Sequence, residues 1–269
     1  MSEAALPGSA YVPAGEGAWT STELTRGPWH PEHQHAGPPI ALVARQIERA
    51  AAPLGLTHMA RLTANLYRPI PLAPVEVSVQ TDYAGRNAGH FSASLSSGAK
   101  EVARFTALVQ REGELPLPEQ LPLHPLPQAP RPPETSPPAK FPFSTKLVGY
   151  PDLMECRVAE GKFFGGPCAI WFRLRHPLIE GEAPSPVERV AVAADSGNGI
   201  SAILDFKRYL FVNSDLTINL LRRPQGEWIC IEARTLLGPD SGGLAEAHIY
   251  DTAGRVGRST QSLALRLRE

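Results

Sequence analysis

An internal repeat constrains the fold of this chain more than any other feature. Residues 62–68 read LTANLYR and residues 216–222 read LTINLLR. Residues 102–106 (VARFT) and 256–260 (VGRST) match in the same order and at the same offset of 154 residues. Two matches at one offset indicate a duplicated structural unit. Because there are only two copies, the repeat predicts a pseudo-dimer of similar units rather than an extended array.

Proline separates the two copies. Eleven prolines fall between Glu114 and Phe143. Proline lacks a backbone N–H and has a fixed φ, so this stretch is unsuited to a helix or a central strand. We expect an extended, polyproline-like connection. The sequence therefore predicts an N-terminal unit over residues 1–113, a proline-rich linker over 114–143 and a C-terminal unit over 144–269.

The first copy has the pattern of one helix followed by strands. A short strand around residues 18–25 precedes a helix over about residues 38–52, in which Ile40, Val43 and Ile47 recur on one face. Turn residues then separate four runs with strand character. These runs are residues 61–68, 75–83, 90–95 and 101–110.

The second copy repeats the pattern. Its helix begins at Ser185 and Glu188, which form a capping box, and its pattern breaks at Gly197 and Gly199, residues suited to a C-terminal cap. The expected strands are residues 168–175, 211–221, 228–235, 245–250 and 256–266. One helix beside antiparallel strands, twice, predicts an α+β fold in which each sheet wraps its helix.

Composition narrows the classes of function. The formal net charge is −1, so no overall field attracts nucleic acid or an anionic membrane. No run approaches the ~18 continuous apolar residues of a membrane span, and the N-terminus lacks the pattern of a signal peptide. The three cysteines form no CxxC motif, which is typical of reduced thiols. We expect a cytoplasmic protein with no nucleic-acid or membrane partner.

Four segments, in this order, carry a family resemblance: GPWHPEHQHAGPPIALVARQIE, RLTANLYRPIPLAPVEV, NSDLTINLLRRPQGEWICIEA and DTAGRVGRSTQSLALR. Together they resemble the acyl-CoA thioesterase II family, in particular its bacterial thioesterase-like branch. The resemblance covers nearly the whole chain outside the proline segment. It implies a double hot-dog fold, in which two antiparallel sheets each wrap one helix and are fused as a pseudo-dimer. It also implies that an activated water hydrolyses a fatty acyl-CoA to free acid and CoA, with no metal, cofactor or covalent intermediate.

The resemblance implies a set of site residues as well. The family uses an Asp at the end of the second helix, a Thr or Ser at the start of the next strand and a Gln on the last strand. These positions correspond to Asp195, to Asn213 or Ser214, and to Gln261. Asn213 departs from the hydroxyl residue of the family, so the middle position stays open between Asn213 and Ser214.

The repeat bears on the same residues independently. Gln261 lies opposite Ala107, and Asn213 lies opposite Met59, so the second copy carries amides where the first is apolar. Burying an amide side chain costs a few kcal/mol of folding free energy unless its hydrogen bonds are satisfied. Each of these two amides is therefore explained by a local hydrogen bond, by an outward orientation or by a function. We hypothesise that Asp195 and Gln261 hold the attacking water, assisted by Asn213 or Ser214.

The first helix offers candidate groups for the thioester carbonyl. Backbone N–H groups at a helix start suit a developing oxyanion, and Gly permits close approach of the backbone. Gly37 and His35 at this helix start are therefore further candidates.

Other functions compete with hydrolysis. His30, His33 and His35 lie close in sequence, but no acid or Cys completes a metal-ligand spacing, so we expect no metal. Hot-dog dehydratases and hydratases use a His/Asp or His/Glu pair, for which only His35 is a candidate. A non-catalytic acyl-CoA or lipid-binding protein would keep the cavity without the catalytic groups. Arg68, Arg222 and Arg223 are candidate contacts for CoA phosphates. We expect a homodimer or a larger homo-oligomer.

Overall fold

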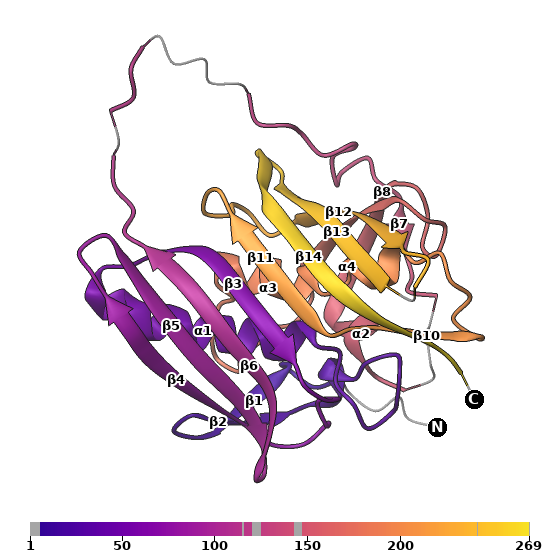
Figure 1. Ribbon diagram of the computed structural model, residues 1–269, viewed down its shortest axis with the longest axis horizontal. Helices are drawn as coiled ribbons and strands as arrows, with labels where there is room; N and C mark the ends of the chain where they lie inside the picture. Colours follow the sequence, from indigo (N-terminus) through magenta and orange to yellow (C-terminus); the bar gives the residue numbers. More distant parts are fainter. Residues whose placement is uncertain (1–5, 115, 120–124, 143–146, 241, 269) are drawn as a thin grey trace.

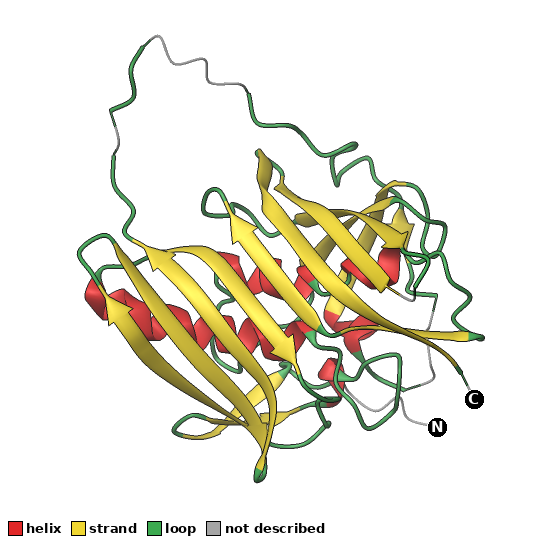
Figure 2. Ribbon diagram, viewed as in Figure 1, coloured by secondary structure: helices red, strands yellow, loops and turns green. Residues whose placement is uncertain are grey.

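The computed structural model describes residues 6–114, 116–119, 125–142, 147–240 and 242–268. The described residues form an α+β fold with one large antiparallel sheet and few helices (Figures 1 and 2). The strands are β1 (Tyr11–Gly15), β2 (Ala18–Ser21), β3 (His58–Leu66), β4 (Val75–Ala84), β5 (Ala88–Ser97), β6 (Lys100–Gln110), β7 (Pro138–Ala139), β8 (Met154–Glu160), β9 (Cys168–Leu174), β10 (Tyr209–Asn213), β11 (Asp215–Leu220), β12 (Ile229–Leu237), β13 (Gly242–Asp251) and β14 (Gly254–Leu267). The α-helices are α1 (Gly37–Ala51), α2 (Tyr150–Leu153), α3 (Pro186–Ala194) and α4 (Gly197–Ile200), and two 3-10 turns are η1 (Glu23–Thr25) and η2 (Ala52–Leu54).

The strand order places the two copies side by side. Along the sheet the order is β1-β2-β4-β5-β6-β3-β11-β14-β13-β12-β9-β8-β7, and β10 pairs with β14 beside this path. In Figure 1 the indigo-to-magenta half lies on the left and the orange-to-yellow half on the right. The bounds of β5, shifted by the repeat offset of 154 residues, coincide with those of β13. The repeat detected in the sequence is therefore a repeat of structure in this part of the chain.

The seam between the copies is the pairing of β3 with β11. Thr63 lies opposite Thr217, its own equivalent in the repeat, and their hydroxyl oxygens are 3.2 Å apart. The pairs two residues away on either side are Asn65 with Asp215 and Arg61 with Asn219. A shift of 154 residues converts one of these pairs into the other, so the seam is self-complementary, like an interface across a twofold axis.

The helices cover one face of the sheet, and the core lies between them (Figure 2). Helix α1 packs on β3 to β6 and also against α3, which packs on β9, β12 and β13. Ile40, Val43 and Ile47 of α1 are fully buried, in agreement with the predicted apolar face. Contact between α1 and α3 therefore joins the two halves on the helical side of the sheet.

Two expectations for the second copy are corrected by the structure. The expected strand over residues 211–221 is divided into β10 and β11 at Ser214. Helix α3 ends at Ala194, with Asp195 as its C-cap, and Gly197 begins the short helix α4. Neither Gly197 nor Gly199 has positive φ, so neither is the left-handed cap that the sequence suggested. The chain turns at Asp195 instead.

Part of the predicted linker lies along the outer edge of the second half. Pro138 and Ala139 form β7, which pairs with β8, and the indole N–H of Trp171 donates to the carbonyl of Arg131. Proline is tolerated at an edge strand because its missing donor faces away from the ladder. The predicted boundary at residues 143 and 144 lies outside the described residues, and the three-part division of the chain stays a prediction. Among the described residues, no helix has both the length and the apolar character needed to cross a membrane.

The predicted capping box of α3 is confirmed and lies in a cluster of charged groups. The Ser185 hydroxyl accepts from the backbone N–H of Glu188, whose carboxylate accepts from the backbone N–H of Ser185. The Ser185 hydroxyl also donates to Glu48 of α1, at 2.6 Å. Burial raises the pKa of Glu188 to about 7, against the lowering effect of the Ser185 hydrogen bond and Arg45. Burial also raises the pKa of Glu48.

The raised pKa of Glu188 predicts a pH-dependent stability. Between pH 4.5 and about 7 the folded chain keeps a proton on Glu188 that the unfolded chain releases, so the free energy of unfolding falls as pH rises through this window. Relative to Glu188→Gln, the wild type should lose about 1–3 kcal/mol of unfolding free energy between pH 4.5 and pH 8. Denaturant titrations of both proteins at a series of pH values measure this difference, and parallel curves would contradict the prediction.

Candidate active site

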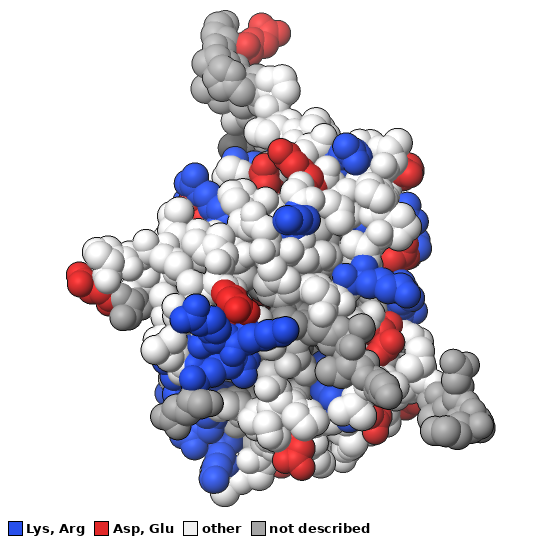
Figure 3. Space-filling view, turned by 90° about the vertical axis from the view of Figure 1, so that its right-hand side faces the viewer, with Lys and Arg blue, Asp and Glu red and all other residues white. Residues whose placement is uncertain are grey.

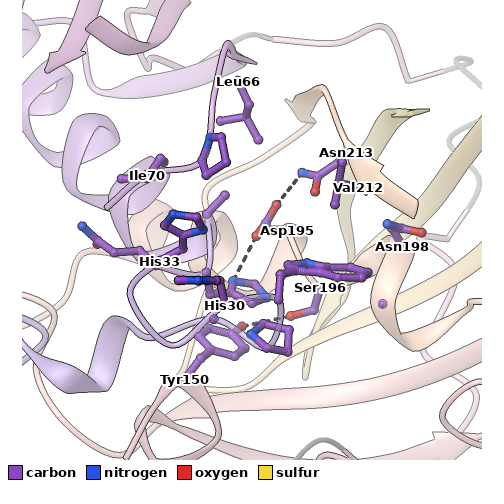
Figure 4. Close-up of a pocket in the computed structure, with 18 of the residues that line it drawn as sticks. His30, His33, Leu66, Ile70, Tyr150, Asp195, Ser196, Asn198, Val212 and Asn213 are labelled. Carbon is purple, nitrogen blue, oxygen red and sulfur yellow. Dashed lines mark hydrogen bonds and ion pairs between the residues drawn. The ribbon is translucent and has the colours of Figure 1, made fainter. Parts of the chain in front are cut away.

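A cavity of about 530 Å³ lies between the two halves of the chain. His35 and Leu66 line it from the first half, Phe141 from the predicted linker, and Asp195 and Asn213 from the second half. Most of its exposed wall is apolar, and polar groups that include Asp195, Ser196 and Asn213 line part of it (Figure 4). A concave apolar site with a few convergent polar groups is the usual form of a small-molecule binding site.

Asp195 is the central polar group of this cavity. As the C-cap of α3, it lies where the chain turns toward α4, and its side chain is only 4% exposed. Its Oδ1 accepts a hydrogen bond of 2.7 Å from Nδ2 of Asn213, at the end of β10. Its Oδ2 lies 2.9 Å from Nδ1 of His35, which comes from the other half of the chain. A dashed line in Figure 4 marks the contact between Asp195 and Asn213.

His35 is held by its backbone and by its ring. Its backbone N–H donates to the carbonyl of Thr25 at 2.8 Å, and its ring stacks on Tyr150 at 3.8 Å between centroids. Nδ1 also lies 3.1 Å from the backbone nitrogen of Gly37, so two contacts compete for one ring nitrogen. A protonated Nδ1 donates to the Asp195 carboxylate and leaves the Gly37 N–H without this acceptor. The shorter, charge-assisted contact with Asp195 favours this form.

Tyr150 is a site residue that the sequence did not point to. Its hydroxyl donates to the carbonyl of Val192 and lies 2.9 Å from the hydroxyl of Ser196, on the turn after α3. Burial raises the pKa of Tyr150 well above its usual range, so the phenol stays neutral. Tyr150 follows the proline-rich segment, where neither periodicity nor the repeat gives a signal. It fixes both the plane of His35 and the position of α3.

Gln261 lies behind the turn and is not among the residues that line the cavity. Its Nε2 donates to the backbone carbonyl of Asp195 at 3.2 Å, and its Oε1 accepts from the backbone N–H of Asn198 at 2.8 Å. The side chain is 2% exposed, so these two bonds satisfy an otherwise buried amide. In the first copy Ala107 takes this position. Helix α1 is continuous there and has no turn like that between α3 and α4, which Gln261 binds. The geometry gives Gln261 a positioning task, and its predicted contact with a water stays a prediction.

The other candidate residues differ in whether they line the cavity. Ser214 lines the cavity at the break between β10 and β11, next to Asn213, whose amide is bonded to Asp195. Gly37 is buried in the packing of α1 on α3 and is not among the lining residues. His30 and His33 line the cavity with ring centroids 4.5 Å apart. Among the described residues, no group of three or more His, Cys, Asp or Glu side chains is arranged to hold a metal ion.

Comparison with known proteins extends these observations. Residues 25–110 match the family model of the acyl-CoA thioesterase N-terminal domain, and residues 119–265 match that of the acyl-CoA thioesterase C-terminal domain. The second match begins inside the predicted linker. No curated protein sequence matches the chain.

Solved structures share the architecture at low sequence identity. A protein of Thermobifida fusca YX described as a thioesterase II has a TM-score of 0.72 and 15% identity, over 97% of this chain and 96% of that one. A hot-dog protein of Alicyclobacillus acidocaldarius has a TM-score of 0.69 and 15% identity, over 94% and 92%. The acyl-CoA thioesterase II TesB2 of Mycobacterium marinum has a TM-score of 0.64 and 15% identity, over 96% of both chains. These likenesses establish a hot-dog fold.

Proposed function

Because the chain belongs to the acyl-CoA thioesterase family, we propose that it hydrolyses acyl-CoA thioesters to a free acid and CoA at the cavity around Asp195. The observation that carries this proposal is the buried Asp195 carboxylate, bonded by Asn213 and facing His35 in a mostly apolar cavity. A carboxylate held in this way can accept a proton from a water and direct its oxygen at a carbonyl carbon. No covalent intermediate and no metal enters the reaction as we propose it.

We propose that the two copies form a double hot-dog pseudo-dimer with one working site. The self-complementary pairing of β3 with β11 supports this arrangement, as does the coincidence of β5 with β13 in the repeat. The site draws His35 from the first copy and Asp195 from the second, so neither copy is complete alone. Division of the chain into two hot-dog units joined by a proline-rich linker is part of the same proposal.

In the proposed reaction each group has a separate task. Asp195 takes a proton from the attacking water, whose oxygen bonds to the carbonyl carbon, and Asn213 holds Oδ1 of the carboxylate. The Gly37 N–H, next to the lining residue Ala36, is the proposed donor to the negative charge that develops on the carbonyl oxygen, since Pro38 and Pro39 have no N–H. The C–S bond then breaks, and the His35–Asp195 pair returns a proton to the leaving sulfur. Gln261 supports the reaction indirectly by fixing the Asp195 turn.

One observation favours a second candidate function. His35 lies 2.9 Å from Asp195, so the cavity contains the His/Asp pair that a hot-dog dehydratase or hydratase would use for proton transfer to carbon. Hydrolysis remains the better-supported function because both family models are those of thioesterases. A non-catalytic acyl-CoA binder would leave the polar bonds of Asp195 without a task.

The experiment that tests the proposal is a thiol-release assay. Purified protein is offered saturated acyl-CoA substrates of graded chain length, and free CoA is followed with a thiol reagent. We expect release of CoA in proportion to free acid formed. A parallel assay follows hydration of a 2-enoyl-CoA by loss of its absorbance. Hydration without thiol release would favour the hydratase, and tight binding without either reaction would favour the binder. The expected homo-oligomer and the cytoplasmic location stay predictions.

A further inference from the structure

The two-stranded ribbon β10–β14 carries a cluster of arginines at one end of the cavity. Arg266 lines the cavity and lies opposite Leu210 in the pairing of the two strands. The ladder continues one step further, since the backbone N–H of Arg268 donates to the carbonyl of Arg208. Residues opposite one another in an antiparallel pair share a face of the ribbon, and so do residues two apart. Arg208, Arg266 and Arg268, called the arginine cluster below, therefore share one face.

The charges of the arginine cluster are not neutralised by neighbouring acids. All three residues are exposed, and the ion pairs found among the described residues use other arginines. The nearby acid Asp205 accepts a hydrogen bond from the backbone N–H of Lys207. The surface that faces the viewer in Figure 3, toward which β10 and the C-terminus project in Figure 1, shows Lys and Arg gathered into a dense group. Such a group attracts an anion.

Aromatic rings hold part of the cluster in place. The Arg268 guanidinium lies 4.6 Å from the ring centroid of Phe206 and 5.8 Å from that of Trp29, which lines the cavity. The Arg208 guanidinium lies over the ring of Tyr209 at 5.8 Å. Stacking on a ring leaves the N–H donors of a guanidinium, which lie in its plane, available to an anion.

Of the three arginines that the sequence offered as phosphate contacts, Arg68 lines the cavity, whereas Arg222 is engaged elsewhere. Arg222 forms a two-pronged ion pair with Asp251, with distances of 2.6 Å from Nη1 and 2.5 Å from Nη2. The Asp251 side chain is fully buried, so this pair serves the packing of the hairpin between β13 and β14. In the arginine cluster, Nε of Arg268 donates to the carbonyl of Tyr209 at 3.3 Å, and no ion pair among the described residues engages the three guanidinium groups.

The distance from Asp195 to the arginine cluster can be estimated along β10. Asn213, which is bonded to Asp195, lies five residues from Arg208, and a strand advances by ~3.3 Å per residue, which gives roughly 17 Å. In CoA about a dozen covalent bonds separate the thiol sulfur from the first phosphorus, which amounts to on the order of 15 Å when extended. A thioester placed at Asp195 would thus bring the CoA phosphates to the arginine cluster.

We propose that Arg208, Arg266 and Arg268 bind the phosphate groups of the CoA nucleotide while the pantetheine arm lies along β10. The proposal rests on the thioesterase function proposed above and makes it specific for a phosphorylated carrier. Each guanidinium donates to phosphate oxygens, and long-range attraction by the cluster raises the rate of encounter. The enzyme should therefore prefer acyl-CoA to the same acyl group on pantetheine, which lacks these phosphates.

The test compares two carriers for one acyl group. The ratio of kcat/KM for acyl-CoA to kcat/KM for acyl-pantetheine is measured in the wild type and in the double variant Arg266→Gln/Arg268→Gln. We expect the ratio to fall at least tenfold in the variant, chiefly through a higher KM for acyl-CoA. The matched control is Arg86→Gln/Lys100→Gln, which removes two exposed charges from hairpins of the first half. It should leave the ratio unchanged.

Binding of free CoA supplies a readout that needs no turnover. Titration calorimetry of the wild type and both double variants should give a Kd that rises at least tenfold for Arg266→Gln/Arg268→Gln alone. An unchanged carrier ratio together with an unchanged Kd for CoA would overturn the phosphate site. Absence of turnover in the wild type, with the loss of CoA binding still confined to this variant, would instead overturn the proposed hydrolysis and leave the phosphate site standing.

Discussion

Replacing Asp195 with Asn is expected to lower kcat for acyl-CoA hydrolysis by about 10³-fold or more. An amide has nearly the same shape as a carboxylate but cannot take the proton of the attacking water, and general base catalysis contributes roughly 10²–10⁴-fold. The side-chain oxygen of an Asn can still accept from Asn213, and its NH₂ group can donate to Nδ1 of His35 once the ring carries its proton on Nε2, so the local packing is kept. The steady-state rate of thiol release measures the effect.

A matched variant separates loss of the base from a general effect of losing a charge. Asp82 lies on β4 in the first half, where its carboxylate accepts from the hydroxyl of Ser92, and Asp82→Asn should retain full activity. The melting temperature of both variants should stay within a few degrees of the wild type. If Asp195→Asn keeps more than a tenth of the wild-type kcat, Asp195 is not the base and the proposed mechanism is wrong.

Replacing Gly37 with Ala is expected to destabilise the protein and to reduce its activity at the same time. An added Cβ would lie 2.5 Å from the backbone carbonyl oxygen of Val192, closer than real Cβ contacts allow. Because that atom belongs to the backbone of α3, relief requires the two helices to separate, at a cost of about 1–3 kcal/mol. The same displacement moves His35 away from Asp195. We expect the melting temperature to fall by roughly 3–10 °C and kcat/KM to fall with it.

The control for Gly37 is a second helical glycine near the same turn. An added Cβ at Gly199 in α4 would meet no atom within 4 Å, and its φ is not positive, so Gly199→Ala should be neutral or slightly stabilising. Differential scanning calorimetry of the two variants measures the contrast. Equal melting temperatures would show that the helices tolerate the extra methyl group. The close contact between α1 and α3 at Gly37 would then not be needed for stability, and the prediction would be wrong.

Much of the fold was predictable because its elements are specified locally. The apolar face of α1 and the capping box at Ser185 gave the helix positions to within a few residues, since both signals lie within the helix or its first turn. The strands after each helix were predictable because turn residues in the sequence separate the runs with strand character. The strands β1, β7 and β8 and the short helix α2 were missed. Contacts distant in sequence contribute to two of them, since Tyr11 of β1 pairs with Ile179 and the backbone N–H of Tyr150 in α2 donates to the carbonyl of Arg26.

The residues of the candidate site were also predicted only in part. Asp195 and Asn213 were selected from the sequence, and the structure brings their side chains together. Tyr150 was missed, and Gln261 was expected beside the water but is bonded to two backbone groups of the turn. A side chain's type and position follow from the sequence, but its hydrogen-bond partners depend on which backbone groups another segment leaves unpaired.

The sequence by itself showed a repeat at an offset of 154 residues, predicted a helix with antiparallel strands in each copy, and showed amides in the second copy where the first is apolar. These are properties of period, offset and residue type, which need no knowledge of contacts. Only the tertiary structure decided that His35 of the first copy faces Asp195 of the second, and that the arginine cluster lies one strand length away. Pairing of β3 with β11 and packing of α1 on α3 bring His35 and Asp195 together, and both join segments more than a hundred residues apart. Pairing of β10 with β14 places the arginine cluster.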